Sequence, residues 1–180
     1  MTYLFDDAIR FDNSPNLDAF GRLRTNQPFT LFDSFHRFQD NGKISEYTSG
    51  TASSTYETNS STILMSVGTA SGDKIYRESS KVFAYQPGKS LLTLQTFCLN
   101  AVKAGLRQRI GYFDTTSGVF LETDGTDIKF VRRNTVSGTL SEWKIPKAEW
   151  NVDRMDGSLG EYNPSGYTLD LSKTQILFMD

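Results

Sequence analysis

Alternation of apolar and polar residues marks several short strands in this chain. Residues 63–67 place one apolar set on a single face of an extended strand. Further along, three alternating runs joined by short turns predict a meander of antiparallel strands. The second of these turns contains Asp124-Gly125, a strong hairpin signal. A fourth strand follows, with Trp143 as its anchor. The predicted strands are residues 107–113, 119–123, 128–132 and 140–145.

The rest of the pattern also favours strands. Residues 91–99 are apolar on both faces, as in the central strand of a sandwich, whereas charges in residues 75–82 predict an edge strand. Ser, Thr and Gly dominate residues 45–61, which predicts an exposed loop or a solvated edge strand. Pro146 favours one helical turn that continues to Trp150.

Short strands separated by turn signals predict an all-β fold, organised as an antiparallel β-sandwich of jelly-roll type. We expect residues 1–40 to form an irregular N-terminal arm and residues 41–180 to form the sandwich. The last apolar stretch, residues 175–180, is typical of a buried strand. Because intact domains usually end in polar sequence, we expect this chain to be the N-terminal part of a longer polypeptide.

One stretch, residues 14–38, fits neither the helical nor the strand period. It contains eight large apolar residues interrupted by charged groups, and Gly21 and Pro28 prevent a single regular element from crossing it. It is either a lid over the domain's own core or a docking arm that meets another subunit, since aromatic residues and Arg are enriched in interface cores. The residues expected to make assembly contacts are Phe20, Arg22, Arg24, Phe29, Phe32, Phe35 and Arg37.

Composition narrows the classes of partner. Nineteen Lys and Arg against 21 Asp and Glu leave a net charge of -2, which gives no general attraction to nucleic acid. No apolar run approaches the ~20 residues of a membrane span. We therefore expect neither a nucleic-acid partner nor a membrane span. The single cysteine, Cys98, cannot form an internal disulfide and is predicted to be a small buried hydrophobe.

Candidates for catalysis are few. His36, with Asp33 and Ser34 nearby, suggests a hydrolytic triad, but close neighbours on one strand do not converge easily. One Cys and one His do not make an ordinary zinc site. A glycosidase would need two carboxyls at catalytic distance, which the sequence does not determine. We expect no catalytic residue, no metal and no cofactor. The glutamates considered for such a pair are Glu78, Glu122, Glu142 and Glu149.

Acidic residues in turns and nearby aromatic residues are candidates for a ligand-binding site. Aspartates in the predicted turns could bind calcium, although Asp in a turn more often bonds its own backbone. With nearby aromatic groups they could also line a carbohydrate-binding surface. Arg107 and Arg109 share a strand face, where they either hold carboxylates across a subunit contact or remain solvated. The possible ligand residues are Asp114, Asp124, Asp127 and Trp143, with Asn163 in a later loop.

Several long blocks resemble a family of structural proteins of tailed bacteriophages, often encountered in marine and cyanobacterial phages. The blocks are SPNLDAFGRLRTNQPFTLFDSFHRF, SGTASSTY, VGTASGDKIYRESSKVFAYQPGKSLL, GLRQRIGYFDTTSGVFLETDGT and TLDLSKTQILFMD. The resemblance covers nearly the whole chain from Ser14 onward and leaves residues 1–13 unmatched. It implies a virion component around the tail, such as a fibre, spike, baseplate or neck part, and it carries over no catalytic residue.

These observations predict a non-enzymatic virion subunit, assembled in the host cytoplasm and repeated as a trimer or ring beside other phage virion proteins. The alternatives are a tail-fibre module that binds a host surface glycan or receptor, and a capsid decoration protein. A third class, a polysaccharide-degrading enzyme, would need a cleft with two facing carboxyls. Exposed aromatic residues separate the first two classes, because flat contacts favour assembly and a concave site with Trp, Asp and Asn favours sugar binding.

Overall fold

The computed structural model describes residues 29–84 and 89–180. In these ranges the chain forms ten strands and one 3₁₀ turn, and all strand pairs are antiparallel, which confirms the predicted all-β fold. The chain divides into two compact units, Met1–Lys89 (unit 1) and Ser90–Asp180 (unit 2). The predicted division at residue 40, between an N-terminal arm and a sandwich, stays a prediction, since residues 1–28 lie outside the described ranges. The sequence did not indicate a division near residue 89, because the runs on both sides of it have the pattern of strands in one sandwich.

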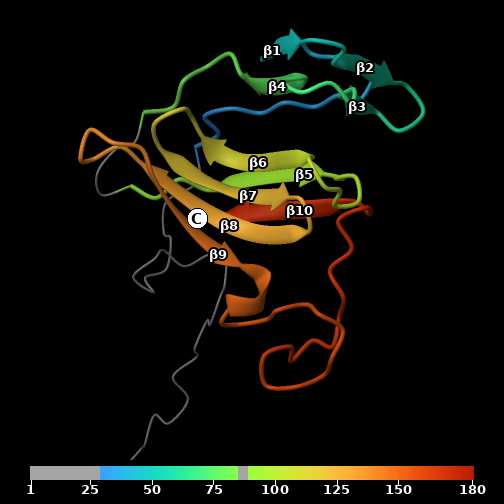
Figure 1. Ribbon diagram of the computed structural model, residues 1–180. Coiled ribbons are helices and arrows are strands. Elements are labelled where there is room, and N and C mark those ends of the chain that lie inside the picture. The colour runs from blue at the N-terminus through green and yellow to red at the C-terminus, as the bar shows by residue number, and fades with distance from the viewer. Residues whose placement is uncertain (1–28, 85–88) are drawn as a thin grey trace, which may run out of the picture. The chain divides into compact units, whose positions relative to one another are not determined.

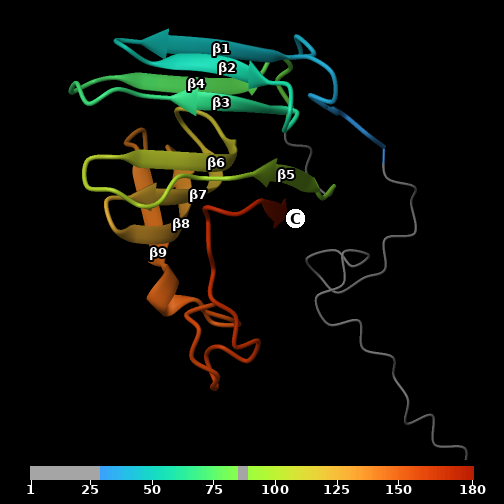
Figure 2. The same cartoon turned by 90° about the vertical axis from the view of Figure 1, so that its right-hand side faces the viewer.

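Unit 1 contains four short strands in two antiparallel pairs (Figure 2). Strand β1 (Ile44–Ser49) pairs with β4 (Lys74–Ser79), and β2 (Ser53–Glu57) pairs with β3 (Thr62–Ser66). The polar stretch of residues 45–61, predicted to be an exposed loop or a solvated edge strand, thus supplies most of β1 and all of β2. The side chains that alternate between the two faces in this stretch are mainly Thr, Ser and Tyr, which are compatible with strands even when they are not buried.

None of the described residues of unit 1 is buried. On one face of the β1–β4 pair, Tyr47 stacks on Tyr76 with ring centroids 4.9 Å apart, and both rings remain nearly half exposed. Leu64 and Met65 of β3 are also exposed. Since a two-stranded pair is marginal in water by itself, the described part of unit 1 has too little buried apolar surface to be stable through its own core.

Unit 2 is built on a four-stranded antiparallel meander in the order β6, β7, β8, β9 (Figure 1). The predicted meander, its fourth strand and both of its turns are confirmed. Gly125 turns the β7–β8 hairpin with a φ of 63°, a left-handed angle that glycine adopts at little cost. The strands are β6 (Arg107–Phe113), β7 (Gly118–Asp124), β8 (Asp127–Asn134) and β9 (Ser141–Pro146).

A second layer of unit 2 consists of β5 (Thr93–Phe97) and β10 (Gln175–Met179). Among the described strands β5 pairs with β10 alone, so it is not the central strand that its two-sided apolar pattern predicted. One side of the pair faces the core and the other is apolar yet open to solvent, which explains the pattern. The exposed side carries Leu94, Ile176 and Phe178, which are 61%, 69% and 44% exposed.

The core of unit 2 lies between these two layers. Leu121 of β7, Leu177 of β10 and Leu171 are buried together. Half-buried residues of β5, β6 and β8 pack around them, so the two antiparallel layers have a sandwich-like arrangement. The surrounding residues include Phe97, Ile110, Ile128, Phe130 and Trp150.

Two local predictions have opposite outcomes. Pro146 leads into a single 3₁₀ turn, η1 (Lys147–Glu149), in agreement with the predicted helical turn. Cys98, predicted to be buried, is exposed. It follows the last residue of β5 on the outward side, where its thiol donates a hydrogen bond to the carbonyl of Ser172 at 3.0 Å.

Candidate functional site

The aromatic segment, residues 29–38, lies in unit 1 as extended chain outside the paired strands. Its exposure alternates along the central part, with the period expected for a strand that covers a surface on one side only. Half-buried side chains at Phe32, Ser34 and His36 alternate with exposed ones at Leu31, Asp33, Phe35 and Arg37.

Four backbone carbonyls of the aromatic segment accept hydrogen bonds from side chains elsewhere in unit 1. The donors come from three separate parts of the sequence, so the backbone of the segment is fixed along its length rather than at one point. These bonds replace the ladder that a neighbouring strand would provide. They join Lys81 Nζ to Leu31 O (3.2 Å), Lys43 Nζ to Asp33 O (2.9 Å), Tyr56 Oη to His36 O (2.8 Å) and Ser61 Oγ to Arg37 O (3.1 Å).

Packing and charge reinforce this attachment. The Phe32 ring meets Phe83 edge-on with centroids 5.5 Å apart. Just beyond the segment, the Asp40 carboxylate accepts a hydrogen bond of 2.7 Å from Arg77, which also pairs with Glu46. The bond from Arg77 is the main reason that the pKa of Asp40 lies below its usual value of 3.8.

The remaining aromatic rings of the segment point away from this attachment. Phe29, Phe35 and Phe38 are 84%, 70% and 82% exposed, and the Arg37 guanidinium lies 5.4 Å from the centroid of Phe38. Of the predicted assembly residues, Phe29, Phe35 and Arg37 are therefore available to a partner, whereas Phe32 packs inside unit 1. Phe20, Arg22 and Arg24 lie outside the described residues.

The three residues considered for a hydrolytic triad do not converge. Each of the three side chains has a different neighbour. His36 Nδ1 lies 3.7 Å from Asp40 Oδ1, Asp33 Oδ1 lies 3.2 Å from Lys43 Nζ, and Ser34 Oγ accepts a hydrogen bond from Asn41.

The acidic turns of unit 2 lie at opposite ends of the meander. Asp114 is in the β6–β7 turn, where its carboxylate accepts hydrogen bonds from the backbone of Ser117 and from Thr116, and these bonds lower its pKa. Asp124 and Asp127 flank the β7–β8 turn at the other end of the same strands. Among the described residues no group of three acidic, His or Cys side chains could hold a metal ion. Asp114 acts locally, as turn residues usually do.

A charged cluster covers one face of the meander, and Glu122 is at its centre. This carboxylate is fully buried, and its Oε2 accepts a hydrogen bond of 2.6 Å from Arg109. The Nζ atoms of Lys129 and Lys144 lie 3.7 and 3.9 Å from its other oxygen. Arg107 pairs with Asp124 at 3.0 Å, which lowers the pKa of that carboxyl. The position of Glu122 at the centre of this cluster was not predicted from the sequence.

Cross-strand register explains how the charged cluster forms. Arg109 is directly opposite Glu122, and Glu122 is directly opposite Lys129. The shared face of Arg107 and Arg109 was predicted, and the carboxylates they hold belong to the neighbouring strand β7. The loop between β7 and β8 is Gly125-Thr126, since Asp124 pairs with Asp127, and this register places opposite charges at paired positions, which stabilises a sheet.

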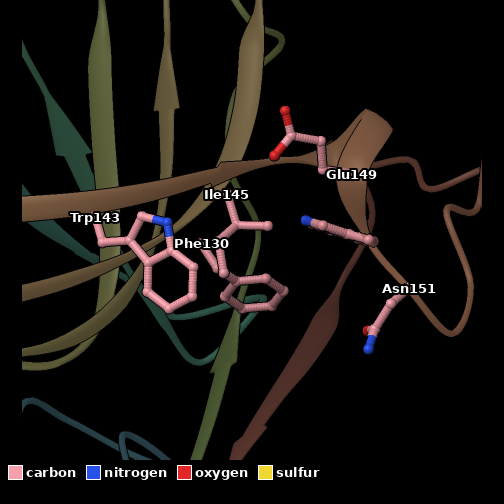
Figure 3. Close-up of a pocket in the computed structure, with 6 residues that line it drawn as sticks. Phe130, Trp143, Ile145, Glu149 and Asn151 are labelled. Carbon is pink, nitrogen blue, oxygen red and sulfur yellow. The ribbon is translucent and has the colours of Figure 1, made fainter.

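A hollow lies on the opposite face of the meander, where η1 follows β9. Its volume is about 360 Å³. Figure 3 shows Trp143, Phe130 and Ile145 side by side along β8 and β9, with Glu149 and Asn151 beside η1. Trp150 completes the lining, and its ring centroid lies 5.0 Å from that of Phe130. Of the predicted ligand residues, Trp143 alone lines this hollow.

The predicted loop residue Asn163 has a structural position. It is 2% exposed, and its amide donates hydrogen bonds to Asp156 Oδ1 and to the carbonyl of Tyr167. These bonds hold the loop that follows η1 together from inside, so the side chain faces the loop's own backbone and not a ligand.

Comparisons with protein-family models, curated proteins and solved structures find no match for this chain. No helix within residues 29–84 and 89–180 has the length and hydropathy needed to cross a membrane.

Proposed function

We propose that this chain is a non-enzymatic structural subunit of a tailed-phage virion, associated with the tail, and that it assembles through the aromatic segment. The observation that carries the proposal is a contrast within that segment. Its backbone is fixed by four side-chain hydrogen bonds, yet three of its phenylalanine rings are mostly exposed. An ordered chain that presents aromatic rings loses little conformational freedom when a partner covers it.

Covering the exposed rings would contribute to association. Covering a Phe side chain contributes about 1.5–3 kcal/mol, so three rings at this exposure contribute roughly 4–7 kcal/mol before the cost of association. One such contact is weak. A closed ring or trimer makes the same contact once per subunit, and the whole assembly is correspondingly stable.

Two further features support association with neighbouring subunits. The described part of unit 1 has no buried residue, although it contains four strands. In unit 2 the outer side of the β5–β10 pair exposes Leu94, Ile176 and Phe178 next to one another in register. Exposed apolar groups clustered in this way are typical of interaction surfaces. The resemblance of the sequence blocks to phage virion proteins supports a particle of that kind as the setting.

The proposal is tested by replacing Phe29, Phe35 and Phe38 together with Ser in the full chain. We expect a folded protein whose mass by light scattering is that of a monomer, where the unchanged chain forms a trimer or ring. Incorporation into phage particles, measured by mass spectrometry of purified virions, should be lost. The matched control is Phe32→Ser, which removes the half-buried ring of the same segment and should reduce the stability of unit 1.

Two results would contradict the proposal. The first is absence of the unchanged chain from purified virions. The second is a triple variant that assembles and enters virions as well as the unchanged chain does, because the exposed rings would then have no partner. If the triple variant fails to fold, the rings belong to the chain's own core, and the lid interpretation replaces the docking arm.

A further inference from the structure

The hollow beside η1 has the size and position of a small ligand site. Its volume of about 360 Å³ falls in the lower part of the range of ~300–1,000 Å³ found for ligand pockets. It lies in unit 2, and none of its lining residues belongs to the aromatic segment or to the charged cluster. A ligand bound there would therefore act separately from the assembly contacts proposed above.

Aromatic rings form the walls of the hollow. Trp143 is 58% exposed, so most of its indole is available to a ligand. The Arg132 guanidinium lies 4.9 Å from its ring centroid and holds the indole from one side by a cation–π contact. Phe130 and Trp150 supply a second, tilted pair of rings. An electron-rich ring face attracts polarised C–H groups, which are what a pyranose presents on its flatter face.

Polar groups complete the hollow. The Nε1 atom of Trp150 is buried and has no hydrogen-bond acceptor among the described residues. Because this atom is closed to a water-sized group, Trp150 contributes its ring to the hollow and not a hydrogen bond. Glu149 and Asn151 are exposed on the η1 side, where they offer acceptors and an amide donor. A hydroxyl both donates and accepts, so a ligand with several adjacent hydroxyls matches this set.

We propose that the hollow binds a neutral hexopyranose unit of a glycan. The sugar ring stacks on Trp143, and its hydroxyls donate to the Glu149 carboxylate. Asn151 provides a further polar contact. The ligand is neutral because the carboxylate of Glu149 in the lining and the guanidinium of Arg132 beside Trp143 together favour neither an acidic nor a basic sugar.

The test uses the full chain and a glycan array that contains glucose-, galactose-, mannose- and N-acetylglucosamine-based oligosaccharides with matched acidic ones. We expect binding to neutral members. The best neutral oligosaccharide is then titrated while tryptophan fluorescence is recorded, because both tryptophans of the chain line the hollow. Trp143→Ala should weaken binding about tenfold or more. Glu149→Gln should weaken it about threefold, through loss of a charge-assisted hydrogen bond.

Tyr167→Ala is the matched control, since Tyr167 is an exposed aromatic residue of unit 2 outside the hollow. Its affinity should equal that of the unchanged chain. The proposal is overturned if no neutral glycan binds at about 10 mM, or if Trp143→Ala binds as well as the control. It is also overturned if Trp143→Ala abolishes self-association in light scattering, because the hollow would then be a protein contact. Failure of virion incorporation would not affect this result.

Discussion

Glu122 offers the sharpest test of how unit 2 is stabilised, through the change Glu122→Gln. The side chain is fully buried, and Arg109, Lys129 and Lys144 all lie within 4 Å of its oxygens. The change keeps the size of the side chain and removes its charge. Arg109 then loses its carboxylate partner, and Lys129 and Lys144 keep only their contacts with Asp124 and Glu142, which raises the energy of the folded state.

The magnitude follows from distances and exposure. One charge pair at about 4 Å contributes ~4 kcal/mol at an effective dielectric of 20, and the cost of burying the carboxylate offsets a large part of the total. The Arg109 and Lys144 side chains remain 26% and 39% exposed, so water screens the repulsion that is left. We expect the free energy of unfolding of unit 2 to fall by roughly 2–3 kcal/mol.

Urea unfolding followed by tryptophan fluorescence measures this change. Both tryptophans lie in unit 2, so the signal reports that unit even if unit 1 unfolds separately. With an m-value of about 1–2 kcal/mol/M, the midpoint should fall by about 1–3 M. Glu161→Gln, at an exposed position of the same unit, should change the free energy by less than ~0.5 kcal/mol.

A double variant separates the charged cluster from other effects of the substitution. Removing Arg109 as well as Glu122 deletes one of the unpaired cations, so the two losses should be less than additive by about 1 kcal/mol or more. If Glu122→Gln is as stable as the Glu161→Gln control, or if the two losses simply add, the charged cluster does not stabilise the sheet and the reasoning is wrong.

Two further predictions concern the meander. Gly118→Ala should lower the free energy of unfolding of unit 2 by about 2 kcal/mol or more, because φ is 133° and the new Cβ would lie 2.3 Å from the Cα of Phe113. In the same urea assay Gly125→Ala should lower it less, because its new Cβ meets no atom within 4 Å. Equal decreases in the two variants would contradict the steric argument. Hydrogen bonds from Arg133 hold the pKa of Glu142 below its usual 4.5, so its stabilisation is complete above that pH and is lost as the pH falls through the lower folded-state value. Urea midpoints measured down the acid range should therefore decrease less steeply in Glu142→Gln, and an unchanged slope would show that this pair does not contribute.

The local parts of the fold were predictable from the sequence. The meander of unit 2 rests on alternating residues and on the Asp124-Gly125 hairpin signal, whose two-residue loop is Gly125-Thr126, and both signals act within a few residues of the chain. The helical turn after Pro146 has the same local origin. The apolar final stretch was correctly read as a strand that reaches the core, since Leu177 of β10 is 7% exposed.

Features that depend on distant partners were harder to predict. The two-sided apolar pattern of β5 has the same appearance whether the second side meets another layer or solvent, and the inference of a central strand was wrong for that reason. Cys98 was assigned to the core on the same pattern. Trp143 was selected as a ligand residue, but its neighbour Trp150 was not, because the contact arises only when η1 turns the chain back toward β8.

The two units meet the cost of folding in different ways, and this difference bears on function. Unit 2 buries Leu121, Leu171 and Leu177 between two layers and also contains a charged cluster, so contacts within the unit stabilise it. The described part of unit 1 has no buried side chain and instead holds an aromatic segment in place by hydrogen bonds to its backbone. The exposed rings of Phe35 and Phe38 add stability when a partner covers them. Under the proposed assembly, the apparent stability of unit 1 should therefore rise with protein concentration, while that of unit 2 should not.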